Sequence, residues 1–92
     1  MQSNEAISTL EFKRIVFEIW EHTPATRIRV RVMGQMWMKN YVQIVHITGS
    51  NAMIVQDKDQ MKHVSINDVT EFEVETKFQD FDPHNHYQVT LS

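Results

Sequence analysis

The fold is decided by the stretch that begins R27-I-R-V-R-V32 and ends T70-E-F-E-V-E75. At both ends, hydrophobic and charged residues alternate with a period of two, which is typical of a strand with one buried and one exposed face. The first strand is expected at 27–33 and the last at 70–75, with three more between them at 36–48, 52–57 and 60–66. Because no helix fits between these strands, residues 27–75 predict a small, strongly bent, five-stranded antiparallel barrel.

Turns and an irregular point divide this stretch. Gly34 followed by Gln35 predicts a tight reversal after the first strand, since glycine takes positive φ without steric cost. The strand at 36–48 is too long to stay flat in a small domain, so we expect it to bend at Lys39-Asn40. A single 3₁₀ turn is expected at 66–69, before the last strand.

The N-terminal segment predicts an amphipathic helix over about residues 4–21. Its hydrophobic residues recur at helical spacing on one stripe: Phe12, Ile15, Val16, Ile19 and Trp20. Two starts are open, because Ser8 with Glu11 fits a capping box while Ser3 or Asn4 could cap an earlier turn. A strand is the alternative, but Val16 and Trp20 break its alternation. Pro24 ends the helix, since it disfavours helical geometry in Thr23.

Composition and length predict one globular domain over residues 1–92, with a C-terminal loop and strand in 77–92, the strand at 86–91. Hydrophobic residues make up 41% and charged residues 23%, which is ordinary for a globular protein. A net charge of −3 argues against a generally basic nucleic-acid-binding surface. The chain has no cysteine, no apolar run near membrane-spanning length and no signal-peptide pattern, so we expect a cytoplasmic protein without a membrane role.

The order of these elements resembles the Sm-like fold of the Sm, LSm and Hfq proteins. The resemblance covers roughly Ser3 to Glu75. It is carried by V30-R-V32 running into Gly34, and by Q60-M-K-H63 followed by V64-S-I-N-D-V69, which is similar to the Gln-Met and Lys-His step before the last strand of Hfq.

The resemblance implies an SH3-type barrel that forms a homo-oligomer, plausibly a ring, through exposed edges of its fourth and fifth strands. It also implies RNA as the ligand, bound near Asn51, Lys62 and His63. The chain lacks the Arg-Gly pair that the family carries before its last strand, so the resemblance implies the fold more directly than the RNA site.

Three arginines form the one concentrated basic stripe, on the exposed face of the first strand. If the last strand closes against the first, as in an Sm-like barrel, its three glutamates lie beside these arginines. Cross-strand ion pairs of this kind contribute about 0.2–1 kcal/mol each. We favour this ladder of pairs over a track for a phosphate backbone; its members are Arg27, Arg29, Arg31, Glu71, Glu73 and Glu75.

A second group of residues suggests contact with other chains. Large apolar residues lie on both faces of the strand that follows the glycine hairpin, and a strand of this kind is usually covered on both sides. The group comprises Met36, Trp37, Met38 and Tyr41, with Trp37 the candidate anchor of an interface. The alternative function is therefore a structural or protein-interaction module without a nucleic-acid role.

No pattern indicates an enzyme, a cofactor or a small-molecule substrate. The serines and histidines lie in no nucleophile elbow, and two glycines cannot build a phosphate-binding fingerprint. Four potential metal ligands alternate near the C-terminus, namely Asp80, Asp82, His84 and His86. Because Pro83 and the turn-forming residues around it disfavour an extended strand there, we expect a solvated loop and no metal site.

Overall fold

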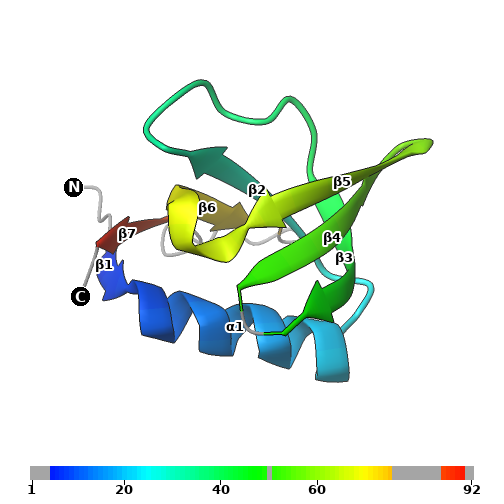
Figure 1. Ribbon diagram of the computed structural model, residues 1–92, viewed down its shortest axis with the longest axis horizontal. Helices are drawn as coiled ribbons and strands as arrows, with labels where there is room; N and C mark the ends of the chain where they lie inside the picture. Colours follow the sequence, from blue (N-terminus) through cyan, green and yellow to red (C-terminus); the bar gives the residue numbers. More distant parts are fainter. Residues whose placement is uncertain (1–4, 50, 76–85, 91–92) are drawn as a thin grey trace.

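The computed structural model describes residues 5–49, 51–75 and 86–90, which form a mainly β structure with one N-terminal helix (Figure 1). Seven strands make one sheet in the order β1-β7-β6-β2-β3-β4-β5. The β1–β7 pair is parallel and the other pairs are antiparallel. The elements in chain order are β1 (Glu5–Ser8), α1 (Thr9–His22), β2 (Arg27–Val32), β3 (Val42–Thr48), β4 (Ala52–Asp57), β5 (Gln60–Ser65), the 3₁₀ turn η1 (Ile66–Asp68), β6 (Val69–Val74) and β7 (His86–Thr90).

The predicted five-stranded barrel is wrong, because the sheet is open. β5 lies at one edge of the sheet, and β6 lies between β7 and β2 rather than at the other edge. Helix α1 runs across the open side of the curved sheet (Figure 1) and contacts β3, η1, β1 and β7. Its buried residues Phe12, Val16 and Ile19 enter the core. A helix therefore covers the core where edge-to-edge strand pairing would have closed a barrel.

The helix begins later than about residue 4. Ser8 is its N-cap, and the Ser8 hydroxyl accepts a hydrogen bond from the backbone N–H of Glu11 at 3.1 Å. Of the two predicted starts, the one at Ser8 is correct. Residues 5–8 form β1 instead, because pairing with β7 satisfies their backbone groups and outweighs local helix propensity.

The predicted strand at 36–48 is wrong in its first half. The hairpin turn consists of Met33 and Gly34, with φ of 55° and 66°, one residue earlier than expected. Trp37 keeps one isolated bridge to Arg31, and the chain then bends at residues 39–40, as predicted, before β3 begins at Val42. The bend interrupts pairing with β2 and turns residues 39–41 toward the outer face of the sheet.

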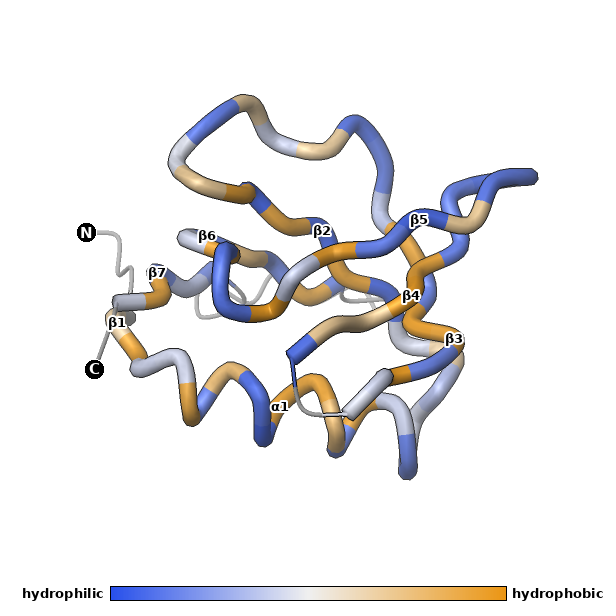
Figure 2. Tube along the Cα trace, in the orientation of Figure 1, coloured by the Kyte–Doolittle hydropathy of each residue, from blue (hydrophilic) through white to orange (hydrophobic). Residues whose placement is uncertain are grey.

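The ends of the other predicted strands lie within one residue of the observed ends. The core is hydrophobic, as expected. Phe72 of β6 joins the helix to the C-terminal strand, since its ring centroid lies 4.6 Å from that of Phe12 and 4.9 Å from that of Tyr87. The strand centres are hydrophobic and the tip of the β4–β5 hairpin is hydrophilic (Figure 2). Among the described residues, the buried ones are Phe12, Val16, Ile19, Ile28, Val30, Val42, Ile44, Ile47, Met53, Val55, Val64, Ile66, Val69, Phe72 and Val89.

Candidate functional site on the outer face of the sheet

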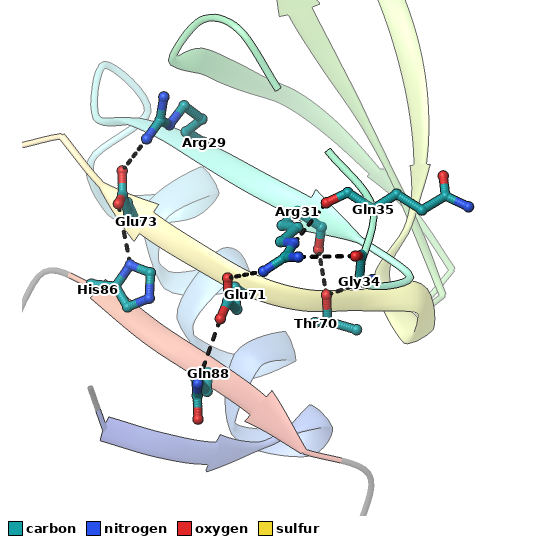
Figure 3. A network of polar contacts seen from close by, with 9 residues as sticks. All are labelled: Arg29, Arg31, Gly34, Gln35, Thr70, Glu71, Glu73, His86 and Gln88. Atoms are coloured by element: carbon teal, nitrogen blue, oxygen red, sulfur yellow. Dashed lines mark hydrogen bonds and ion pairs between the residues drawn. The ribbon is translucent and has the colours of Figure 1, made fainter. Parts of the chain in front are cut away.

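A ladder of ion pairs crosses the outer face from β2 to β6, as predicted. The nitrogen–oxygen distances are 2.7 Å for Arg27–Glu75, 2.9 Å for Arg29–Glu73 and 3.0 Å for Arg31–Glu71. The ladder reaches β7, where His86 lies 3.1 Å from Glu73 and Gln88 donates to Glu71 at 3.5 Å (Figure 3). These arginines are neutralised within the sheet, so they do not form a free phosphate track.

Glu73 is the centre of the most connected part of this face. Its carboxylate accepts hydrogen bonds from Arg29 and from the hydroxyl of Tyr41, at 2.9 and 3.0 Å, and contacts His86. Burial raises the pKa of Glu73, but the bonds from His86 and Tyr41 and the charge of Arg29 outweigh burial, and the net pKa is lowered. Glu73 therefore acts as a fixed anion that joins three strands.

Two aromatic side chains cover Arg29 on this face. The Arg29 guanidinium lies 5.0 Å from the ring centroid of Trp37 and 5.5 Å from that of Tyr41, within cation–π range. Trp37 also reaches His86, with 5.5 Å between ring centroids. Burial, followed by the bond to Glu73, raises the pKa of Tyr41, so its phenol remains a neutral donor.

The residues predicted as an interface thus have different surroundings. Trp37 and Tyr41 are half-buried against the chain's own sheet, and Met38 packs partly against the core. Met36 is 90% exposed beside the hairpin turn. Of the four, Met36 offers the apolar surface that another molecule could cover.

An open pocket of about 550 Å³ lies on the other side of Tyr41. Ligand sites commonly have volumes of about 300–1,000 Å³. Its walls come from the start of β2, the bend at 39–41, β3, β4 and the β4–β5 turn. The lining residues are Arg27, Lys39, Asn40, Tyr41, Gln43, Gln56 and Lys58.

The lining contains three cations and no carboxylate. Arg27 is bound to Glu75 through two bonds of 2.7 Å, which raise its pKa and neutralise its charge. Within the described part of the chain, neither Lys39 nor Lys58 forms an ion pair, and both are exposed. The two lysines therefore supply positive charge to the pocket that no direct ion pair neutralises.

Asp57 does not line the pocket, but it holds the lining residue Asn40 in place. It accepts a hydrogen bond from the Asn40 amide at 3.0 Å and pairs with Lys62 at 3.1 Å. The bonds from Asn40 and Lys62, with the charge of Lys58, lower the pKa of Asp57. Asp57 remains ionised at neutral pH and accepts a hydrogen bond from the side-chain nitrogen of Asn40. The side-chain oxygen of Asn40 is therefore free to accept a hydrogen bond from a ligand.

The three residues predicted to contact RNA do not face one ligand. Asn51 lies in the β3–β4 turn, where its side-chain carbonyl accepts from Lys13 and Asn67 at 3.4 Å each. Lys62 is paired with Asp57, and His63 follows it in β5. Successive strand residues point to opposite faces, so Lys62 and His63 cannot line the same surface.

Among the residues that the structure describes, no group of three or more His, Cys, Asp or Glu side chains is arranged to hold a metal ion. Of the four residues considered as metal ligands, three (80, 82 and 84) lie outside the described ranges, and His86 contacts Glu73. The helix described here lacks the length and hydrophobicity needed to cross a membrane.

Comparison with known proteins adds no relative. No protein-family model, curated protein or solved structure matches this chain.

Sequence reasoning missed this pocket, although part of its signal was present. The bend at Lys39-Asn40 was predicted inside one long strand, and a break was predicted between the strands at 52–57 and 60–66. Their meeting depends on the register that places Gln43 opposite Gln56, which a bulge between Ile44 and His46 helps to set. A one-residue change in register reverses which side chains face outward, and the sequence does not show the bulge.

Proposed function

We propose that this chain binds single-stranded RNA in the outer-face pocket, as a small Sm-like module that acts by binding rather than by catalysis. The observation that carries the proposal is the pair of unpaired lysines, Lys39 and Lys58, on a pocket lined otherwise by amides, Tyr41 and a neutralised arginine. Lysines neutralise phosphates, while an aromatic wall and amides suit exposed bases.

The position of β6 beside β2 supports the Sm-like part of the proposal, because the resemblance implies this pairing of the last strand with the first. The RNA site is proposed on the outer face instead of near Asn51, whose side-chain carbonyl already accepts from two residues. The proposal places the chain in the cytoplasm, where a protein without cysteine needs no oxidising environment.

Fluorescence anisotropy with a labelled ten-nucleotide RNA of mixed sequence, at 50 to 200 mM salt, tests the function. Each phosphate contact on single-stranded nucleic acid contributes about −0.7 to the slope of log K against log salt. The K39A/K58A variant should bind more weakly, with a slope shallower by roughly 1.4. Both lysines are exposed, so the fold should persist.

The matched control is K13A/R14A on helix α1, which removes the same charge away from the pocket and should bind like the natural chain. Lys13 contacts Asn51, so this control also tests the site that the family resemblance implies. If K13A/R14A binds more weakly and K39A/K58A does not, the RNA binds near Asn51 and not in the pocket. No binding by the natural chain at 50 mM salt would refute the function.

A second candidate function, assembly with other copies, is favoured by the outer edge of β5. Within the described sheet, β5 and β1 are the edge strands, and Met61 on β5 is 62% exposed. β6 is paired with β2 on one side and with β7 on the other. We propose pairing through the β5 edge instead. Light scattering should give a mass above that of one 10.9 kDa chain, and a monomer at high concentration would contradict assembly.

A further inference from the structure

Helix α1 has a second stripe of residues that faces away from the core. The sheet lies on one side of this 14-residue helix (Figure 1), where Phe12, Val16 and Ile19 are buried. Residues at i, i+4, i+7 and i+11 share one face of a helix. On the face opposite the core this spacing gives the outer stripe, which comprises Leu10, Arg14, Phe17 and Glu21.

Two members of the outer stripe are apolar. Leu10 is 66% exposed, and Phe17 is half-buried, with its ring centroid 6.0 Å from that of Trp20. Leu10 and Phe17 border an open hollow of about 400 Å³. The other residues that line this hollow are Lys13, Arg14, Glu18 and Glu21. The helix therefore presents an apolar surface, framed by charges, that a partner molecule can cover.

The charges around the hollow are divided between the two halves of the helix. Lys13 and Arg14 lie in the N-terminal half, and Glu18 and Glu21 lie in the C-terminal half. This order is unfavourable within one helix, because the helix dipole favours acidic residues near the N-terminus and basic residues near the C-terminus. An i, i+4 pair also contributes less when the basic residue comes first, as it does in Arg14 and Glu18. The stability of the single helix does not account for this order.

Contacts within the chain leave these charges accessible. Arg14 lies 3.2 Å from Glu11, and Glu18 lies 4.0 Å from His22, but all four side chains are at least 45% exposed. Exposed ion pairs contribute little to stability and rearrange easily. Glu21 is exposed and forms no ion pair with any residue that the structure describes. Both ends of the outer stripe can therefore pair with charges on another molecule.

We propose that the outer stripe is a dimer interface, occupied by α1 of a second copy of this chain in the antiparallel orientation. In a dimer with two-fold symmetry every contact occurs twice, so the surface must be complementary to itself. Reversing one helix places its acidic half beside the basic half of the other. The dimer leaves the proposed RNA site open, because the outer-face pocket and the hollow on α1 share no lining residue.

The register of the two helices follows from the rise of about 1.5 Å per residue. If the two Phe17 side chains meet on the symmetry axis, Arg14 lies about 4.5 Å and Lys13 about 6 Å along the helix from that axis. Glu21 of the second copy lies about 6 Å from the axis on the same side. Its carboxylate is therefore level with the two basic side chains, and Leu10 is level with the end of the second helix.

The dimer should be weak and reversible. A helix of 14 residues is about 21 Å long. Two helices of this length bury less surface than the roughly 1,600 Å² of a standard stable interface. Sedimentation equilibrium at low salt, with chain concentrations from about 1 μM to about 1 mM, covers the range expected for such a complex.

Two charge reversals test the proposal. R14E brings like charges together at both contacts between Arg14 and Glu21 in the symmetric dimer, and so does E21R. Each variant alone should dimerise at least about tenfold more weakly than the natural chain. An equimolar mixture of the two should recover the dimer, because each acidic position then faces a basic one. Both positions are exposed, and circular dichroism verifies that each variant is folded.

The control is Met61→Lys, which places a charge at the β5 edge and should leave the dimerisation constant unchanged. A natural chain that is monomeric over the whole concentration range overturns the proposal. Dimerisation that persists in R14E and E21R, or that is lost in Met61→Lys, also overturns it, because the interface then lies elsewhere. A mixture of two folded variants that stays monomeric contradicts the antiparallel pairing of Arg14 with Glu21. None of these results bears on RNA binding, which the anisotropy titrations test separately.

Discussion

Met33 occupies a backbone conformation that its side chain disfavours. Its φ of 55° lies in the left-handed region, next to Gly34 at 66°, and together they make the two-residue hairpin turn after β2. Such turns favour Asn-Gly, because an L-residue with a bulky side chain loses about 1–2 kcal/mol in this region. The methionine is also 59% exposed, so it contributes little packing in compensation.

Met33→Asn should therefore raise the free energy of unfolding, by about 0.5–1 kcal/mol, and raise Tm by a few degrees. Thermal unfolding followed by circular dichroism measures this. The control is Met36→Asn, since Met36 is more exposed and its φ is not positive. An equal change in both variants would show that polarity, and not backbone conformation, is responsible.

Glu73 gives the structure a defined response to acid. The pKa of Glu73 is lowered in the folded chain from its ordinary value of 4.5. The ionised carboxylate therefore stabilises the fold at pH values above 4.5, and this stabilisation is lost as the pH falls below 4.5 and through the lower pKa of the folded chain. Glu73→Gln should lower the unfolding free energy at pH 7 by about 1.5–3 kcal/mol, the range for hydrogen bonds to charged groups.

The difference between the natural chain and Glu73→Gln should shrink as the pH is lowered from 7 toward 3. Urea unfolding at several pH values measures it. Glu18→Gln is the control, since Glu18 is 73% exposed on the helix and its substitution should have only a small effect on stability. A Glu73→Gln deficit of the same size at pH 3 and pH 7 would contradict this account of the network.

At the scale of elements, the start of α1 depends on one hydroxyl. Ser8→Ala removes the acceptor of the Glu11 N–H and should lower the unfolding free energy by about 1 kcal/mol. Ser65→Ala is a matched control, because Ser65 precedes η1 but makes no side-chain capping bond. Chemical denaturation of both variants decides the matter, and equal stability of the two would show that the cap contributes nothing.

Local pattern predicted the elements better than their connections. The period-two alternation of Arg27 to Val32 and of Thr70 to Glu75 predicted both strands. The arginines of the first and the glutamates of the second correctly predicted that the two strands pair. The same pattern could not show that residues 5–8 would leave the helix, because their partner is β7, about 80 residues further along the chain. Pairing across that distance depends on the whole fold and not on local propensity.

At the scale of the whole molecule, the open sheet determines where a ligand can bind. One side of the sheet is covered by α1 (Figure 1), and the other carries the ion-pair ladder, part of which Figure 3 shows. The Trp37 and Tyr41 side chains that cover Arg29 and the basic pocket lie on this same outer face. The sequence predicted the ladder, whose charges alternate visibly. The pocket could not be predicted, since it requires the bend, the bulge and the β4–β5 turn to meet in space.

The proposal therefore places RNA on the outer face despite the net charge of −3. The ladder neutralises three arginines with three glutamates, and this leaves Lys39 and Lys58 as a local positive area. A local patch of this kind steers a polyanion even when the total charge is unfavourable, provided the ionic strength is low.

The most direct test of this central claim is an NMR titration of ¹⁵N-labelled protein with a ten-nucleotide RNA of mixed sequence, following the backbone amide of each residue. The account predicts that the largest shift changes occur around the pocket, at Lys39, Asn40, Tyr41, Gln43, Gln56 and Lys58, while those of α1 stay in place. Changes confined to Asn51 and His63, or no change at saturating oligonucleotide, would contradict it.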